Sequence, residues 1–348
     1  MHIGFVIYGS LDTLSGGYFY DRKLVEYLRS HGDSVEIISL PWRNYTSHLM
    51  DNLRFKLPKK LDILVEDELN HPSLILPNRR KHSYPVVSLV HHLRSSELRP
   101  AWQNGIYRSI ERKYLRSVNG FIFNSKTTKK TVLNLLHEDK PSVLAYPPVD
   151  EFGAPISQHD IRERAIRDNF RILFLGNVIY RKGLHTLLEA VKGLNSKVHV
   201  DVVGSLTYEP SYVSLIQEII EKNQLSSCVS LHGAVEHEAL IEKFKPAHVM
   251  VVPSSYEGFG IVYLEGMCFG LPAIGTTAGA AGEIIEPGKT GYLIAQDDVK
   301  TLAEHLQSLA QDRDLLTHLS LNARERYLRQ PPWTGSARNI RDFLYSLL

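Results

Sequence analysis

The feature that most constrains the fold is an alternation of short apolar runs with amphipathic stretches, repeated along almost the whole chain of 348 residues. The apolar runs are rich in β-branched side chains, which is typical of strands covered on both faces. Between them, apolar residues recur at intervals of three and four, the helical period. A chain that alternates strands and helices in this way forms parallel sheets with helices on both faces, so we predict an α/β protein.

The strand pattern occurs in two series. We predict strands of the first series at Ile3–Tyr8, Val35–Leu40, Ile63–Glu66, Val86–His91, Gly120–Asn124 and Val143–Tyr146. We predict strands of the second series at Ile172–Leu175, Val198–Val203, Val229–His232, Val249–Val252 and Pro272–Gly275. The polar stretch between the two series, up to Asn169, is interpreted as a link between two domains of roughly 150 residues each.

Helices are expected between and after these strands. In the first half and the link we predict them at Tyr20–Leu28, Tyr107–Leu115, Thr127–Leu136 and Ile161–Ile166. In the second half we predict them at Gly183–Val191, Tyr212–Lys222, Glu238–Phe244, Gly260–Phe269, Leu302–Ala310, Leu315–Arg329 and Trp333–Leu348.

Charge and composition exclude several classes of protein. The formal net charge of +2 gives no general argument for nucleic acid, although residues 1–150 carry +6 and the remainder −4. No apolar run approaches the ~20 residues of a membrane span, and the N-terminus does not look like a signal peptide. Only Cys228 and Cys268 are present, without the spacing of a zinc site or a disulfide framework. We therefore expect a cytoplasmic protein.

The most informative motif follows the strand predicted at 249–252 and opens a helix. It reads Ser-Ser-Tyr-Glu-Gly-Phe-Gly from 254 to 260, and Glu265 lies about two helical turns beyond Glu257. Gly258 and Gly260 let the backbone approach a ligand, and the amides of a first helical turn favour phosphate. Each carboxylate can accept two hydrogen bonds from vicinal sugar hydroxyls. The alternative is a turn with solvated glutamates, but the end of a buried strand favours a binding site.

A second loop, 175–183, also joins a strand to a helix. Gly176 permits a tight turn there, Asn177 follows it, and Arg181 and Lys182 stand just before the helix that begins near Gly183. Cations at a helix start oppose its dipole unless an anion is bound, and a diphosphate would neutralise them. The alternative is a pair of solvated basic residues. A third glycine-rich loop, 279–283, ends in Glu283 and is weak evidence alone.

The first half offers fewer signals. Gly16 and Gly17 follow the first strand but do not form the G-x-G-x-x-G fingerprint of a dinucleotide site. His91 and His92 stand at the end of another strand, where a histidine could hydrogen-bond a substrate hydroxyl or be merely structural. No third imidazole or carboxylate stands nearby at a convincing spacing, so we predict no metal site.

Together these motifs resemble the retaining glycosyltransferases of family four in the GT-B superfamily, which use nucleotide-sugar donors. The resemblance spans nearly the whole chain and is strongest from Phe170 to Ile294, where the E-x₇-E element from Glu257 to Glu265 is its most specific part. It implies two Rossmann-like doubly wound domains facing a cleft. Residues 1–150 would bind the acceptor and residues 151–332 the donor, with the helix at 333–348 crossing back to the first domain.

The resemblance also implies roles for the donor-side residues. Glu257 would contact the donor sugar, Glu265 the ribose hydroxyls, and Glu283 would lie beside the sugar or the phosphates. The cations of the second loop and the amides around Phe259 and Gly260 would neutralise the diphosphate leaving group. The family commonly has arginine after the glycine at position 176, and Asn177 departs from this.

On the acceptor side, Gly16 and Gly17 would line the cleft and His91 would contact the transferred sugar. The family more often has an acidic residue after this histidine, so His92 is a second departure. Such enzymes retain anomeric configuration and generally need no metal, so we expect no cofactor and a front-face displacement. Partners would be a UDP- or GDP-sugar and a glycan, lipid-linked or small-molecule acceptor.

Three rival interpretations remain open: a nucleotide-sugar hydrolase or epimerase of this architecture, a non-catalytic nucleotide-sugar binding protein, and a Rossmann dehydrogenase. The missing glycine fingerprint disfavours the last. Two basic patches, Lys56–Lys60 and Arg79–Lys81, lie in the basic first half. They suggest peripheral association with anionic lipids at the cytoplasmic face of a membrane, or a phosphate-linked lipid acceptor; the alternative is a pair of solvated loops.

Overall fold

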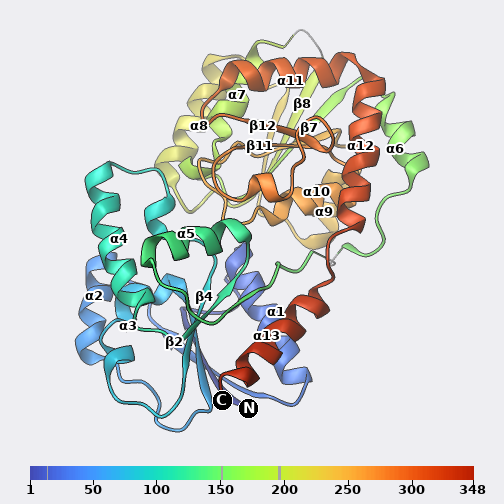
Figure 1. The fold of residues 1–348 in the computed structure, drawn as a ribbon. Helices are drawn as coiled ribbons and strands as arrows, with labels where there is room; N and C mark the ends of the chain where they lie inside the picture. The colour runs from blue at the N-terminus through green and yellow to red at the C-terminus, as the bar shows by residue number, and fades with distance from the viewer. Residues whose placement is uncertain (14, 150–151, 195–196) are drawn as a thin grey trace. The chain divides into compact units, whose positions relative to one another are not determined.

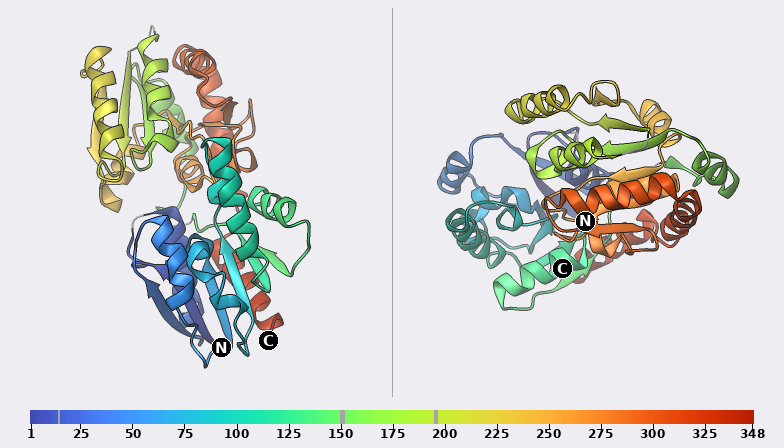
Figure 2. Two further views of the ribbon diagram at one scale, coloured as in Figure 1. Left: turned by 90° about the vertical axis from the view of Figure 1, so that its left-hand side faces the viewer. Right: turned by 90° about the horizontal axis from the view of Figure 1, so that it is seen from above.

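The computed structural model describes residues 1–13, 15–149, 152–194 and 197–348. The chain forms two compact units, the first made of Met1–Pro148 with Pro331–Leu348 and the second of Val149–Gln330. The domain boundary predicted at position 150 falls outside the described residues. Each unit contains a six-stranded parallel sheet covered by helices on both faces, which confirms the predicted α/β class (Figures 1 and 2).

The sheet of the first unit has the strand order β2-β1-β3-β4-β5-β6. Its strands are β1 (His2–Tyr8), β2 (Ser34–Leu40), β3 (Ile63–Asp67), β4 (Val86–Val90), β5 (Gly120–Phe123) and β6 (Ser142–Leu144). Its helices are α1 (Gly16–Ser30), α2 (Tyr45–Arg54), α3 (His71–Leu74), α4 (Ala101–Leu115), α5 (Lys126–Leu136) and α13 (Trp333–Ser346). Short 3₁₀ turns occur at Glu68–Asn70, Pro77–Arg79 and Arg94–Ser96.

The central strand β1 divides the core of this unit in two. Ile3, Phe5 and Ile7 belong to one buried apolar cluster, while Val6 and Tyr8 belong to the other. Successive side chains of a strand point to opposite faces, so one strand serves both clusters. This explains why β1 is continuously apolar from Ile3 to Ile7 rather than alternating.

The C-terminal helix α13 packs in the first unit beside α1 (Figure 1). The ring of Trp333 meets that of Tyr20 edge-on at 5.0 Å between centroids. Arg341 donates a 2.6 Å hydrogen bond from Nε to the carboxylate of Asp33. Both contacts place a segment from the end of the sequence against the start of the chain.

The sheet of the second unit has the order β12-β11-β10-β7-β8-β9. Its strands are β7 (Phe170–Leu175), β8 (Val198–Val203), β9 (Val229–Gly233), β10 (Val249–Val251), β11 (Ala273–Thr276) and β12 (Gly291–Ile294). Its helices are α6 (Gln158–Ala165), α7 (Leu184–Lys192), α8 (Pro210–Lys222), α9 (His237–Phe244), α10 (Ile261–Cys268), α11 (Val299–Gln311) and α12 (Arg313–Leu328). Counted from β7, this is the 3-2-1-4-5-6 order of dinucleotide-binding folds, in which β7 and β10 flank the switch point.

Three elements differ from the sequence prediction, because α2, α3 and β12 were not expected. All the predicted strands and helices are present. The ends of β8 agree with the prediction, and most of the others are shifted. Among the residues that the structure describes, no helix is both long enough and apolar enough to cross a bilayer.

Candidate functional site

The main candidate site lies in the second unit, at the carboxyl ends of β7 and β10. The two strands pair in parallel, with Ile172 opposite Val249, so the loops that follow them emerge side by side. The first loop reaches α7 through a 3₁₀ turn at Tyr180–Lys182, and the second leads into α10. Open α/β sheets bind ligands at this position. Two of the predicted motifs therefore meet at the switch point.

The centre of this site is a buried ion pair. Lys182 donates a 2.6 Å hydrogen bond from Nζ to Oε1 of Glu257, and Ser254 Oγ donates to the same oxygen at 2.6 Å. Arg181 donates from Nη1 to the backbone oxygen of Tyr256 at 2.7 Å and lies 3.9 Å from Glu257. The loop cations that were predicted to face an anion thus face a carboxylate of the same chain. The alternative of solvated side chains does not apply to Lys182 and Glu257, because their side chains are only 12% and 9% exposed.

Glu257 is ionised despite its burial. Burial alone would raise the pKa of Glu257, but the charges of Lys182 and Arg181 outweigh it and lower that pKa to about 2. Burial lowers the pKa of Lys182, and the negative charges of Glu257 and Glu265 oppose this shift. The site therefore holds an ionised carboxylate and a basic side chain in contact, both largely buried.

Two glycines allow the loops to approach closely. Gly183 has a φ of 70°, and a Cβ there would lie 2.2 Å from the oxygen of Pro253. Gly279 has a φ of 80°, and a Cβ would lie 2.2 Å from the oxygen of Glu257. Ala280 N also donates to this oxygen at 2.8 Å. Only glycine fits both positions, and the third loop is thereby fastened to the motif around Glu257.

The helices that begin at the site lack side-chain caps. Both α7 and α10 start after a glycine with positive φ, Gly183 and Gly260, and neither helix has a side-chain cap hydrogen bond. The first amides of a helix carry partial positive charge and suit an anionic ligand. Beside them, Gly258 and the buried Phe259 form the turn that leads into α10.

Other predicted donor-side residues occupy different positions. Asn177, next to Gly176, accepts a 3.2 Å hydrogen bond at Oδ1 from Ser205 N and so ties its loop to the one after β8. Glu265 lies half-buried on α10. Glu283 ends the 3₁₀ turn Ala281–Glu283, and its backbone oxygen accepts a hydrogen bond from Arg326 at 3.2 Å.

A second polar cluster lies in the first unit, at the carboxyl ends of β3 and β4. Gly16 and Gly17 are the first residues of α1, and a Cβ at Gly17 would come within 3.3 Å of the ring of His91. His91 lies 3.1 Å from Asp21 of α1, measured from Nε2 to Oδ1. His92 instead lies 2.8 Å from Glu97, so the two histidines have different carboxylate neighbours.

The fold corrects one step of the sequence argument. No carboxylate was expected near His91, yet Asp21 and Asp67 come together with it so that their ligand atoms lie within 4.8 Å of one another. Burial alone would lower the pKa of His91, but Asp21, followed by Asp67 and Glu68, raises it to about 9. Near neutral pH this ring therefore carries a positive charge, and its Nε2 donates to Asp21.

Sequence reasoning missed Ser254, Asp21 and Asp67. Asp21 had a detectable signal, because it falls on the same helical face as the buried Leu24, Val25 and Leu28. An aspartate on an apolar face implies a buried partner. Ser254 and Asp67 stand at strand ends and gave no comparable signal.

Comparison with known proteins agrees with this fold. A sucrose-phosphate synthase from Thermosynechococcus elongatus superposes with a TM-score of 0.84 at 19% identity, covering 99% of this chain and 98% of that one. HepE from Anabaena, solved with UDP and glucose, gives 0.75 at 19% identity over all of both chains. Residues 157–326, nearly half of the chain, match the family model of the group 1 glycosyl transferases. The chain has the GT-B fold, and its second unit matches the group 1 glycosyltransferases.

The curated relatives of this chain include named glycosyltransferases. The capsular polysaccharide biosynthesis glycosyltransferase CapM of Staphylococcus aureus is 28% identical over 209 residues, which is 56% of this chain and 52% of CapM. A glycogen synthase of Mycobacterium tuberculosis is 24% identical over 268 residues, 76% of this chain and 63% of that protein. The chain spans about half to two thirds of the length of such relatives.

Proposed function

We propose that the protein is a retaining glycosyltransferase of family four that moves a hexose from a UDP- or GDP-sugar to a hydroxyl of a glycan, lipid-linked or small-molecule acceptor. The observation that carries this proposal is the charged cluster of Lys182, Arg181 and Glu257 at the switch point of the unit that matches the glycosyltransferase family. The solved complexes of HepE with UDP and glucose support a nucleotide-sugar donor.

In this proposal the leaving diphosphate binds at the uncapped starts of α7 and α10. Lys182 and Arg181 neutralise its charge, so no metal ion is needed for that step. The bond from the anomeric carbon to the β-phosphate oxygen breaks, and the acceptor oxygen bonds to that carbon on the same face. The acceptor proton passes to the leaving β-phosphate, and the anomeric configuration is retained.

The carboxylates position the donor rather than attack it. Glu257 accepts hydrogen bonds from the sugar and holds Lys182 in place, and Glu265 accepts from the ribose hydroxyls. Glu283 lies beside the sugar or the phosphates. Gly176 and Asn177 shape the loop after β7. In the first unit, protonated His91 donates to the transferred sugar, and Gly16 and Gly17 let that sugar approach.

Thermal melting with UDP, GDP, ADP and their sugar conjugates, each with and without EDTA, tests the donor. A ligand at a hundred times its Kd stabilises the fold by about 2.7 kcal/mol. We expect one nucleotide series to raise the melting temperature equally with and without EDTA. A shift that EDTA abolishes, or no shift with any nucleotide, would contradict the proposal.

The transfer step is tested with Glu257→Gln, which keeps the shape of the side chain and removes its charge. We expect sugar transfer at least about a hundredfold slower than in wild type, while the exposed Glu238→Gln on α9 transfers at the wild-type rate. A folded Glu257→Gln protein with normal turnover would refute the role of Glu257. Release of free sugar that never depends on an acceptor would indicate a hydrolase instead.

A further inference from the structure

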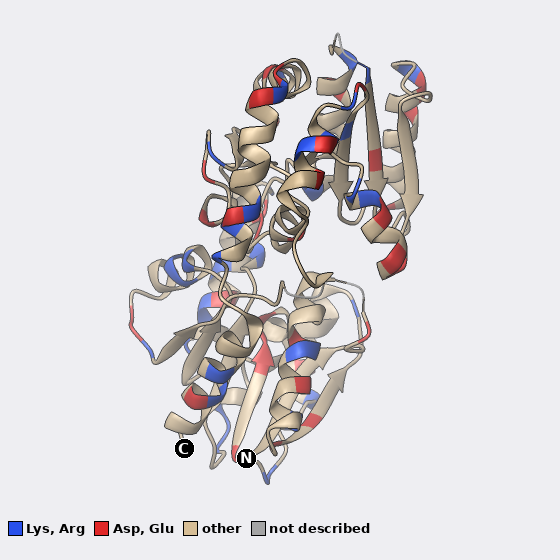
Figure 3. Ribbon diagram, turned by 90° about the vertical axis from the view of Figure 1, so that its right-hand side faces the viewer, with Lys and Arg blue, Asp and Glu red and all other residues tan. Residues whose placement is uncertain are grey.

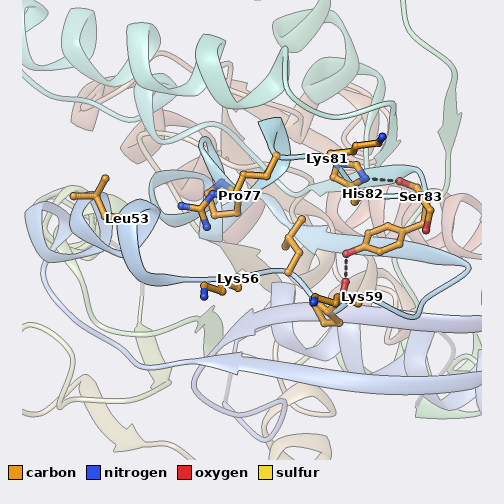
Figure 4. Close-up of a pocket in the computed structure, with 11 residues that line it drawn as sticks. Leu53, Lys56, Lys59, Pro77, Lys81, His82 and Ser83 are labelled. Carbon is orange, nitrogen blue, oxygen red and sulfur yellow. Dashed lines mark hydrogen bonds between the residues drawn. The ribbon is translucent and has the colours of Figure 1, made fainter.

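The first unit contains a pocket of about 620 Å³ that the proposed reaction does not use. It is formed by the segment between α2 and β3 and by the segment that leads into β4. The basic patches at 56–60 and 79–81 therefore meet around one pocket, although they are separate in the sequence. Figure 4 shows Lys56 and Lys59 on one side of this pocket and Lys81 and His82 on another.

The charges around the pocket are of one sign. Its lining includes Lys56, Lys59, Arg80 and Lys81, all exposed, and contains no aspartate or glutamate. Arg80 donates to the backbone oxygens of Asn52 and Phe55 at the end of α2. Among the described residues, no carboxylate pairs with any of these four cations. In Figure 3, blue segments for Lys and Arg lie on loops near the N-terminus of the first unit, where red segments for Asp and Glu are also present.

The surface beside these cations is apolar. Leu53 lines the pocket and is 64% exposed, and Met50, one turn earlier on α2, is 55% exposed. The buried residues of this helix are instead polar: His48, Asp51 and Asn52. Helix α2 thus turns apolar side chains to the solvent beside a cluster of cations. This combination fits an anionic lipid surface, where phosphates meet the cations and apolar side chains enter the acyl boundary.

The pocket is separate from the candidate transfer site. It lies at the amino ends of β3 and β4, whereas Asp67 and His91 lie at their carboxyl ends. A five-residue strand spans about 17 Å, so one ligand headgroup cannot occupy both places. We propose that this pocket binds the phosphate headgroup of an anionic membrane phospholipid and docks the first unit on a bilayer. The inference does not depend on the transfer reaction, because lipid binding is measured without donor or acceptor.

Flotation of the full chain with vesicles tests the proposal. We expect the protein to float with vesicles of phosphatidylglycerol and phosphatidylcholine, and to stay unbound with phosphatidylcholine alone. The double variant Lys59→Glu/Lys81→Glu removes two cations of the pocket. Its partition coefficient falls at least about 25-fold, since each cation near an anionic surface contributes about a factor of five. Leu53→Ser weakens binding at unchanged charge.

The matched control is Lys113→Glu/Lys130→Glu, which changes the net charge equally at exposed positions on α4 and α5. This control variant should keep most of the wild-type vesicle binding. If it loses as much binding as Lys59→Glu/Lys81→Glu does, the vesicles attract the net charge of the protein alone, and the proposal is overturned. Absence of flotation with anionic vesicles would also overturn it. A third result would overturn it: glycerol 3-phosphate stabilises the wild type but not the Lys59→Glu/Lys81→Glu variant, and the wild type does not bind vesicles. The occupant of the pocket would then be a free phosphate ester.

Discussion

At the scale of single residues, Glu257 is held in its charged form, although it is buried, by the two cations beside it, Lys182 and Arg181. The pKa of Glu257 is lowered to about 2, chiefly because Lys182 and Arg181 overcome the cost of burial. Removing one member of a buried pair leaves an uncompensated charge, whereas removing both does not. Comparing single and double substitutions therefore measures how strongly the two side chains depend on each other.

We predict that Lys182→Met lowers the free energy of unfolding of the second unit by about 3 kcal/mol, because Glu257 keeps its charge beside Arg181 and loses its closest cation. The double variant Lys182→Met/Glu257→Gln should lose less than the sum of the two single variants, by at least about 1 kcal/mol. Urea unfolding of the four proteins measures this coupling. Additive losses would mean that the two side chains contribute independently.

At the scale of elements, strands and helices with continuous or periodic apolar patterns could be predicted from the sequence, and elements without them could not. Helix α2 was missed because its buried residues are polar while Met50 and Leu53 are exposed. Helix α3 has four residues, too few for a period, and β12 follows a turn as a four-residue edge strand. The motif around Glu257 was detectable because two glycines closely follow this residue in the sequence. The approach of Asp21 to His91 was not detectable, because it depends on tertiary packing.

The turn between β7 and α7 illustrates how one backbone position fixes an element. Gly183→Ala should lower the free energy of unfolding of the second unit by more than about 2 kcal/mol, since φ is 70° and a Cβ would overlap the oxygen of Pro253. The control is Gly193→Ala. Gly193 lies at the end of the same helix with a φ of −89°, and a Cβ there would meet no atom closer than 3.9 Å. This substitution should change the free energy of unfolding by no more than about 1 kcal/mol. Denaturant unfolding compares the two, and equal losses would contradict the steric argument.

At the scale of the whole molecule, the two units differ in the pKa values of the buried carboxyl groups at the carboxyl edges of their sheets. The second unit keeps Glu257 ionised beside two cations. The first unit buries three consecutive acids, Glu66, Asp67 and Glu68, and burial raises the pKa of each. Stability should therefore respond to pH differently in the two units.

In the first unit, burial raises the pKa of Glu66 from 4.5 to about 8, against the opposing effect of its hydrogen bond from Asn78. Below pH 4.5 this carboxyl is protonated in both the folded and the unfolded chain and favours neither. Between pH 4.5 and about 8 the unfolded chain ionises first, so folding loses stability on the order of 5 kcal/mol as the pH rises. His91 acts in the same direction, because its raised pKa stabilises the fold below pH 6.5 and this contribution is lost through about 9.

We therefore predict that the melting temperature of the first unit falls as the pH rises from 5 to 8, and that Glu66→Gln flattens this dependence by removing the titrating group. The exposed Asp139→Asn on the same unit should leave the slope unchanged. Calorimetric scans at half-unit pH steps measure all three proteins. A first unit that becomes more stable toward pH 8, or a Glu66→Gln protein with the wild-type slope, would contradict this prediction. Either result would mean that Glu66 is ionised in the fold. Its buried position would then require a cationic partner, and no ion pair with Glu66 occurs among the residues that the structure describes.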